Sequence, residues 1–190
     1  MLKNHKRRAI LIAALFGLLL PGAGARGLFT DAERTGTITG TVDGIQMEWR
    51  TVETDTAEGP QGTANYIVMM DTMYEYTLQG HQGDNLVEGA IAIVFSSFTG
   101  PVANCPCQLT GEINYWSTSS TFNDLYLTTD AVITVQEAEE IAEGVWRLVG
   151  TAEGQLDYYE SLMRPEPSGE PITVTVEFSV DRVLGGELEF

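Results

Sequence analysis

The amino-acid sequence predicts an all-β protein, namely an antiparallel β-sandwich of about eight or nine strands. Polar and apolar residues alternate along most of the chain, most clearly in residues 172–181 (ITVTVEFSVD). This period of two is typical of strands with one buried and one solvated face. Clusters of glycine, proline, asparagine and aspartate separate these segments. Because so many strands do not remain one flat sheet, two packed sheets are expected, and a small closed β-barrel is the alternative.

The first 25 residues are expected to be a cleaved signal peptide that lies outside the fold. Residues 1–8 are basic, residues 9–20 form an apolar run, and residues 23–25 (AGA) match the pattern that signal peptidases cleave. The apolar run is shorter than the roughly 20 residues of a membrane-spanning helix. The sequence therefore predicts an exported protein, periplasmic or extracellular, with no membrane span after cleavage.

A single domain is expected at residues 35–184. A flexible N-terminus at residues 26–34 precedes it, and a C-terminal tail at residues 185–190 follows it. A chain of this length is long enough to bury one hydrophobic core.

The N-terminal half of the domain contains five expected strands. Asp43-Gly44 suits a two-residue hairpin turn because both residues tolerate positive φ, so a strand is expected on each side of it. Two segments rich in tyrosine, methionine and valine follow the turn-forming AEGPQG, and an apolar segment follows GHQGDN. These strands are expected at residues 35–42, 45–53, 64–71, 73–80 and 86–98.

The C-terminal half of the domain contains four more expected strands. A hairpin is expected around STSSTFND, Glu143-Gly144 forms the next turn, and the proline-interrupted RPEPSGEP precedes the last strand. Residues 135–144 (VQEAEEIAEG) fit either a short helix or an acidic extension of a strand. These strands are expected at residues 109–117, 125–136, 145–158 and 172–181.

Acidic residues dominate the chain that follows the signal peptide. It contains 27 acidic residues, six arginines and no lysine, which gives a net charge of −21. This charge argues against nucleic acid and anionic membranes as partners, because a strongly negative surface repels both. The excess of carboxylates is compatible with cation binding or with an acidic, solvated surface.

No catalytic motif stands out in the sequence. The G-x-S-x-G elbow of hydrolases, the phosphate-binding glycine loop and the H-E-x-x-H zinc motif are all missing from it. His81 is the only histidine after the signal peptide, which argues against catalytic triads and histidine-rich metal centres. The sequence therefore predicts a protein that is not an enzyme.

The chain has two cysteines, Cys105 and Cys107, which are separated by a single proline. In an exported protein the expected state of this pair is a disulfide that stiffens a loop. A redox pair is a second interpretation. A third is a soft-metal site for Cu(I), to which Met69, Met73 and His81 would contribute further ligands.

The hairpin around STSSTFND supplies the candidate ligand-binding residues. With the turn centred on residue 121, Trp116 lies opposite Tyr126 and Glu112 lies opposite Asp130, and Asn114 shares their face. Two aromatic rings beside polar groups would form a platform on which a sugar ring can rest. Two opposed carboxylates are unfavourable unless a cation lies between them.

A Ca²⁺ site is a further interpretation of the acidic composition. An expected loop contains three clustered acids, Glu53, Asp55 and Glu58, but they lack the regular spacing of a known calcium loop. No cofactor is therefore predicted beyond these two candidate ions, Ca²⁺ and Cu(I).

These observations together predict an exported binding or accessory domain. It would recognise a carbohydrate or another small ligand on a sheet face or through its loops. The first alternative is a structural subunit of a surface or envelope, which would have an envelope partner instead of a ligand. The second alternative is a Cu(I) carrier that uses Cys105 and Cys107.

Overall fold

The computed structural model describes residues 32–57, 59–69, 72–83, 89–98, 101–103, 105–118, 123–163 and 166–187, and the expected signal peptide lies outside them. The described residues form ten strands and no helix, which confirms the all-β prediction. Among them no helix has the length and apolar character needed to cross a membrane. The strands are β1 (Glu33–Val42), β2 (Ile45–Thr56), β3 (Gly59–Gly62), β4 (Ala64–Met69), β5 (Met73–Gly80), β6 (Ile91–Ser97), β7 (Cys107–Trp116), β8 (Asn123–Ala142), β9 (Val145–Ser161) and β10 (Ile172–Glu187).

The strand bounds differ from the expected ones in both directions. β1 begins at Glu33 and β10 ends at Glu187, beyond the strands expected at residues 35–42 and 172–181, whereas β6 begins only at Ile91. β3 lies in the segment GPQG, for which the sequence predicts a turn; Pro60 is tolerated there because β3 is an edge strand. β8 continues to Ala142, so the helical alternative for residues 135–144 is wrong.

All ten strands belong to one hydrogen-bonded sheet in the order β3-β2-β1-β10-β4-β5-β6-β7-β8-β9. Neighbouring strands are antiparallel except β10 and β4, which pair in parallel between residues 184–187 and 65–68. β10 also pairs with β9, so the sheet partly closes into a ring. The structure therefore does not show the two separate sheets of the predicted sandwich, and it has ten strands where eight or nine are expected.

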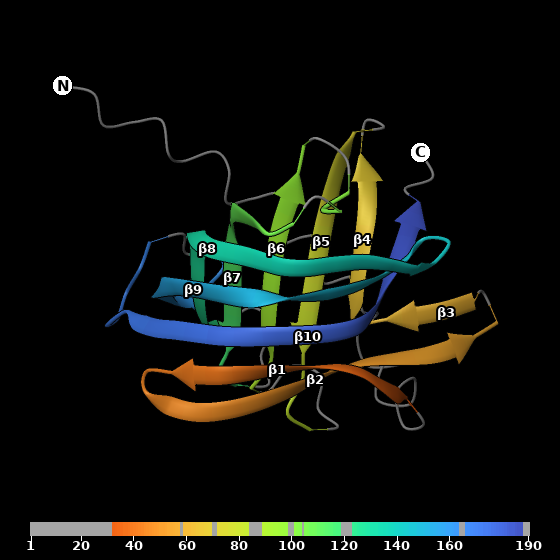
Figure 1. Ribbon diagram of the computed structural model, residues 1–190. Coiled ribbons are helices and arrows are strands. Elements are labelled where there is room, and N and C mark those ends of the chain that lie inside the picture. Colours follow the sequence, from red (N-terminus) through yellow and green to blue (C-terminus); the bar gives the residue numbers. More distant parts are fainter. Residues whose placement is uncertain are drawn as a thin grey trace.

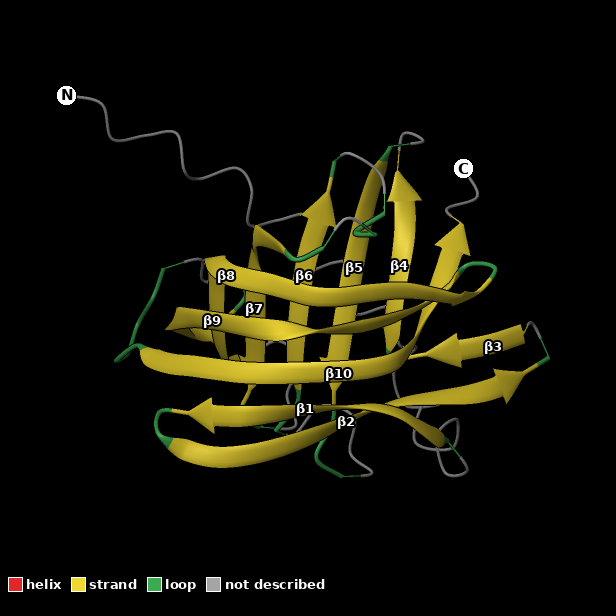
Figure 2. Ribbon diagram, viewed as in Figure 1, coloured by secondary structure: helices red, strands yellow, loops and turns green. Residues whose placement is uncertain are grey.

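β10 connects the two directions in which the sheet runs. Figure 1 shows β8, β9, β10, β1 and β2 crossing in front of β4, β5, β6 and β7, and Figure 2 shows that strands make up most of the described chain. Residues 174–180 of β10 lie between β1 and β9. The register then shifts between Val180 and Val183, and the end of the strand pairs with β4. Since bulges bend strands, this irregularity allows one strand to serve both parts of the sheet.

A row of aromatic rings forms the centre of the core. Tyr66, Tyr76 and Phe95 lie opposite one another on β4, β5 and β6, with ring centroids 5.5 and 5.1 Å apart. Phe95 then contacts Phe178 on β10 at a centroid separation of 6.5 Å. Phe95 and Phe178 are each 1% exposed. The row therefore joins the two crossing parts of the sheet through its interior.

Two glycines make room for these rings. Gly111 on β7 lies opposite Phe95, and Gly150 on β9 lies opposite Phe178. A Cβ atom on Gly150 would lie 2.6 Å from Cζ of Phe178, and a Cβ atom on Gly111 would lie 3.1 Å from Cβ of Phe95. Both distances are shorter than an ordinary van der Waals contact, and the backbone oxygens of Thr134 and Val94 lie closer still, so neither position has room for a side chain.

Gly150→Ala is expected to lower the free energy of unfolding by about 1–3 kcal/mol or more, because the added methyl group would overlap the carbonyl oxygen of Thr134 on β8 and the Phe178 ring. Gly83→Ala is the matched control, since no heavy atom lies within 4 Å of a Cβ added there. Urea unfolding followed by tryptophan fluorescence measures both variants. Equal stability of the two would contradict the tight contact between β9 and the aromatic row.

Candidate functional site

Cys105 and Cys107 converge at the start of β7. Their Sγ atoms lie 2.7 Å apart, and the thiol of Cys105 donates a hydrogen bond to the carbonyl oxygen of Val102 at 2.9 Å. Burial, together with the neighbouring Cys107 thiol, raises the pKa of Cys105 to about 12. Both cysteines are free and half-buried. A disulfide bond has a length of about 2.05 Å, so the predicted disulfide is not formed in this structure and the two thiols are only close neighbours.

The structure does not bring the predicted soft-metal ligands together. Met69 and Met73 lie opposite each other on β4 and β5, on the face of the sheet that points away from the core. Cys105 and Cys107 pack against the core instead. His81 follows the other end of β5 and is 1% exposed. Among the described residues, no three histidine, cysteine, aspartate or glutamate side chains are grouped so that they could hold a metal ion.

The register of the β7–β8 hairpin differs by one residue from the expected one. Tyr115, not Trp116, lies opposite Tyr126, and Trp116 lies opposite Leu125. Because successive side chains point to opposite faces of a sheet, Trp116 and Tyr126 lie on different faces. Trp116 is 7% exposed and packs with Leu125 and Tyr159. The two residues therefore do not form one exposed aromatic platform.

Tyr126 belongs instead to a row of three tyrosines. Tyr115, Tyr126 and Tyr158 lie opposite one another on β7, β8 and β9, with ring centroids 6.2 and 5.1 Å apart. The hydroxyl group of Tyr158 donates a hydrogen bond to Oδ1 of Asp124 at 2.6 Å, and this bond raises the pKa of Tyr158 to about 12. Gly169 packs against the Tyr158 ring, and Tyr115 is buried in the core. The row is therefore packed at both ends.

The other residues of the predicted contact surface are separated from one another. The register of β7 and β8 shifts at Glu112, so Glu112 and Asp130 are not a paired position of the two strands. Asp130 accepts a hydrogen bond from the hydroxyl group of Thr128 at 2.7 Å, and Asn114 is buried. The predicted direct pairing of these two carboxylates is therefore not formed.

Glu112 has a different carboxylate neighbour, Glu75. Glu112 lies opposite Val94 on β6, and Glu75 lies opposite Ser96 on the other side of the same strand, so both point to the same face. Burial raises the pKa of both carboxyl groups, and the charge of Glu75 raises the pKa of Glu112 further. Sequence reasoning missed this pair because it depends on which strands flank β6.

Glu112→Gln is expected to raise the free energy of unfolding at neutral pH, because it removes a half-buried charge. The folded pKa of Glu112 lies above the ordinary value of 4.5, so the folded state binds the proton more tightly than the unfolded state. The stability contributed by this group therefore falls as the pH rises from 4.5 through the folded pKa. The advantage of the variant should shrink as the pH is lowered toward 4.5. Urea unfolding at several pH values measures it, and an advantage independent of pH would contradict this assignment.

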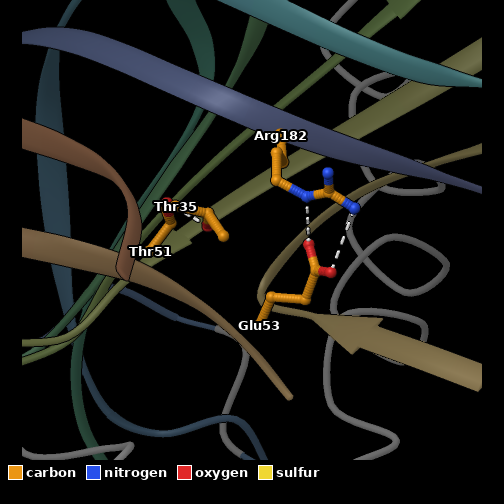
Figure 3. A network of polar contacts seen from close by, with 4 residues as sticks. All are labelled: Thr35, Thr51, Glu53 and Arg182. Atoms are coloured by element: carbon orange, nitrogen blue, oxygen red, sulfur yellow. Dashed lines mark hydrogen bonds and ion pairs between the residues drawn. The ribbon is translucent and has the colours of Figure 1, made fainter. Parts of the chain in front are cut away.

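An ion pair occupies part of the predicted Ca²⁺ cluster. Figure 3 shows Glu53 facing Arg182, whose Nε and Nη2 atoms donate to the two carboxylate oxygens at 2.8 and 3.2 Å. These bonds raise the pKa of Arg182. Beside them the hydroxyl groups of Thr35 and Thr51 lie 3.0 Å apart and link β1 to β2. Glu58 lies outside the described residues. Glu53 therefore ties β2 to β10 instead of standing open to a cation.

A hollow of about 230 Å³ lies on the outer face of β1, β10, β9 and β8. Its sides are formed by two rows of residues that lie opposite one another on three neighbouring strands. The rows are Thr37–Ser179–Val149 and Thr39–Glu177–Thr151. Gly150 and Phe178 also line the hollow. The arrangement gathers hydroxyl groups from strands at both ends of the domain around one carboxylate.

Gln136 reaches the hollow from a bulge in β8. The register of β8 and β9 shifts between Val135 and Glu137, so Gln136 is the extra residue of the longer strand. Its carboxamide group supplies a further hydrogen-bond donor and acceptor beside the hydroxyl groups of the hollow. Sequence reasoning missed this hollow. The alternation in the first and last strands predicts that these side chains point outward, but not that the two strands are neighbours.

No protein-family model matches this chain, and no curated protein is significantly similar to it.

Proposed function

We propose that the protein is an exported binding domain that recognises a carbohydrate, or another small hydroxylated ligand, in the hollow on β1, β10, β9 and β8. The observation that carries the proposal is the set of hydroxyl and carboxamide side chains around one hollow of about 230 Å³. These groups both donate and accept hydrogen bonds, as the hydroxyl groups of a sugar do. The hollow is smaller than the roughly 300–1,000 Å³ of pockets for drug-sized ligands, so it suits a group the size of one sugar unit.

The chemistry of the hollow favours binding over catalysis. Among the described residues that line it, Glu177 is the one titratable side chain. Glycoside hydrolysis commonly requires two carboxyl groups that flank the scissile bond. Val149 offers an apolar contact for the face of a ring. Because paired strands hold these side chains about 4.8 Å apart from strand to strand, a ligand would meet a surface that is already arranged.

Thr39→Val and Thr151→Val should each weaken ligand binding, because valine keeps the shape of threonine but removes the hydroxyl group. The loss of one hydrogen bond costs about 0.5–1.5 kcal/mol, which is roughly a two- to tenfold loss of affinity. Thr41→Val is the matched control, since Thr41 lies on the same face of β1 but outside the hollow. Calorimetric titration with neutral and charged oligosaccharides measures the three variants.

Two results would contradict this function. Unchanged affinity in Thr39→Val and Thr151→Val would locate the ligand elsewhere, for example at the row that contains Tyr126 and Tyr158. A protein that binds no oligosaccharide but assembles as its concentration rises would favour the alternative of a surface or envelope subunit. Sedimentation velocity distinguishes an assembling subunit from a monomeric binding domain.

We also propose that Cys105 and Cys107 form a disulfide in the exported protein. Their sulfur atoms converge in the structure, and disulfides persist in oxidising compartments. Each thiol loses one proton and one electron when the bond forms. An external disulfide such as oxidised glutathione accepts the two electrons and is reduced to two thiols. The pair would then stiffen the loop that leads into β7.

The intact mass of the exported protein should therefore be about two daltons below that of the reduced chain, because two hydrogens are lost. Iodoacetamide should not modify it unless a reductant is added first. The Cys105→Ser/Cys107→Ser variant is the control. Its mass should not be lowered by two daltons, and iodoacetamide should not modify its cysteine positions even after a reductant is added. Two thiols that react readily without reductant, or a mass that includes bound copper, would contradict the disulfide, and the second would favour the Cu(I) carrier.

A further inference from the structure

We infer that the ligand of the hollow carries a positive charge, as an amino sugar does; this inference rests on the proposed function. Glu177 lies in the middle of one row, between Thr39 on β1 and Thr151 on β9. It is the only charged side chain among the described residues that line the hollow. The hollow therefore presents hydroxyl groups around one negative charge.

Arg34 and Arg147, which flank the hollow, contact other carboxylates. On the β2 side, Arg34 contacts Glu48 at 2.9 Å. On the β9 side, Arg147 contacts Glu137 and Asp181 at 3.5 and 3.6 Å. These three acids leave neither arginine with an unbalanced charge to offer an anionic ligand.

Two arginines, Arg34 and Arg50, lie beside Thr37. Arg34 also donates a hydrogen bond to the hydroxyl group of Thr37 at 2.6 Å. Arg50 lies opposite Thr37 on β2, is half-buried and interacts with other groups of the fold. Within the part of the chain that the structure describes, no arginine forms an ion pair with Glu177. Its carboxylate is therefore available to a ligand.

The net charge of the whole chain also favours a cationic ligand. After the signal peptide the chain carries a net charge of −21, which attracts cations and repels acidic or sulfated sugars. Because Glu177 is exposed, its attraction for an ammonium group is modest and is screened by salt. We expect a preference of about two- to fivefold at low salt, and a smaller one at high salt.

The test compares three β-1,4-linked tetrasaccharides by calorimetric titration at low and high salt: the tetramer of glucosamine, the tetramer of N-acetylglucosamine, and cellotetraose. Only the glucosamine tetramer is charged, and it should bind about two- to fivefold more tightly than the other two at low salt. Glu177→Gln should remove this preference and leave the neutral tetramers unaffected. Glu153→Gln should keep the preference, since Glu153 is exposed on the same face of β9 but lies outside the hollow.

The possible failures separate the two proposals. Equal binding of the three tetramers, weakened by Thr39→Val, would overturn the inference about charge and keep the proposed function. Absence of binding by all three would overturn both. Spermidine is the last probe, because it carries charge but no hydroxyl groups. If it binds as tightly as the glucosamine tetramer and Thr39→Val weakens neither, the inference of a hydroxylated, charged ligand is overturned.

Discussion

The contact between Phe95 and Phe178 is the interaction on which the rest of the structure depends. It joins β6 to β10 through the interior, and Tyr66 and Tyr76 continue the row across β4 and β5. A well-placed aromatic pair contributes about 0.5–1.5 kcal/mol beyond the burial of its rings. The contact requires a residue without a side chain opposite it, which is Gly150 on β9. One continuous sheet can therefore fold over itself and still pack tightly.

The same contact determines the surface on the other side of β10. Because Phe178 points into the core, its neighbours Glu177 and Ser179 must point outward. β10 lies between β1 and β9, so these two side chains are flanked by outward-facing residues such as Thr39 and Thr151. The hollow is thus a consequence of the inner packing and requires no loop to form it. A change in the core would disturb the hollow as well.

Local pattern predicts the strands well but does not predict their neighbours. Asp43-Gly44 predicts the first hairpin, and both residues adopt the expected positive φ, 50° and 79°. β3 is missed because Pro60 is compatible with a strand only at an edge, and a sequence does not reveal edges. The sequence wrongly predicts Trp116 opposite Tyr126, because STSSTFND does not define the centre of its turn. A shift of one residue in the register moves every side chain to the other face. The hydroxyl rows escape prediction for a similar reason, since they depend on pairing between the two ends of the domain.

The most direct test of this account is a titration of isotope-labelled protein with the glucosamine tetramer, followed by NMR. The account predicts that the amide signals that shift belong to β1, β10, β9 and β8, with the largest changes around Thr39, Thr151 and Glu177, and that the shifts saturate. Shifts confined to Tyr126 and Tyr158, or small shifts spread evenly over the acidic surface, would contradict it.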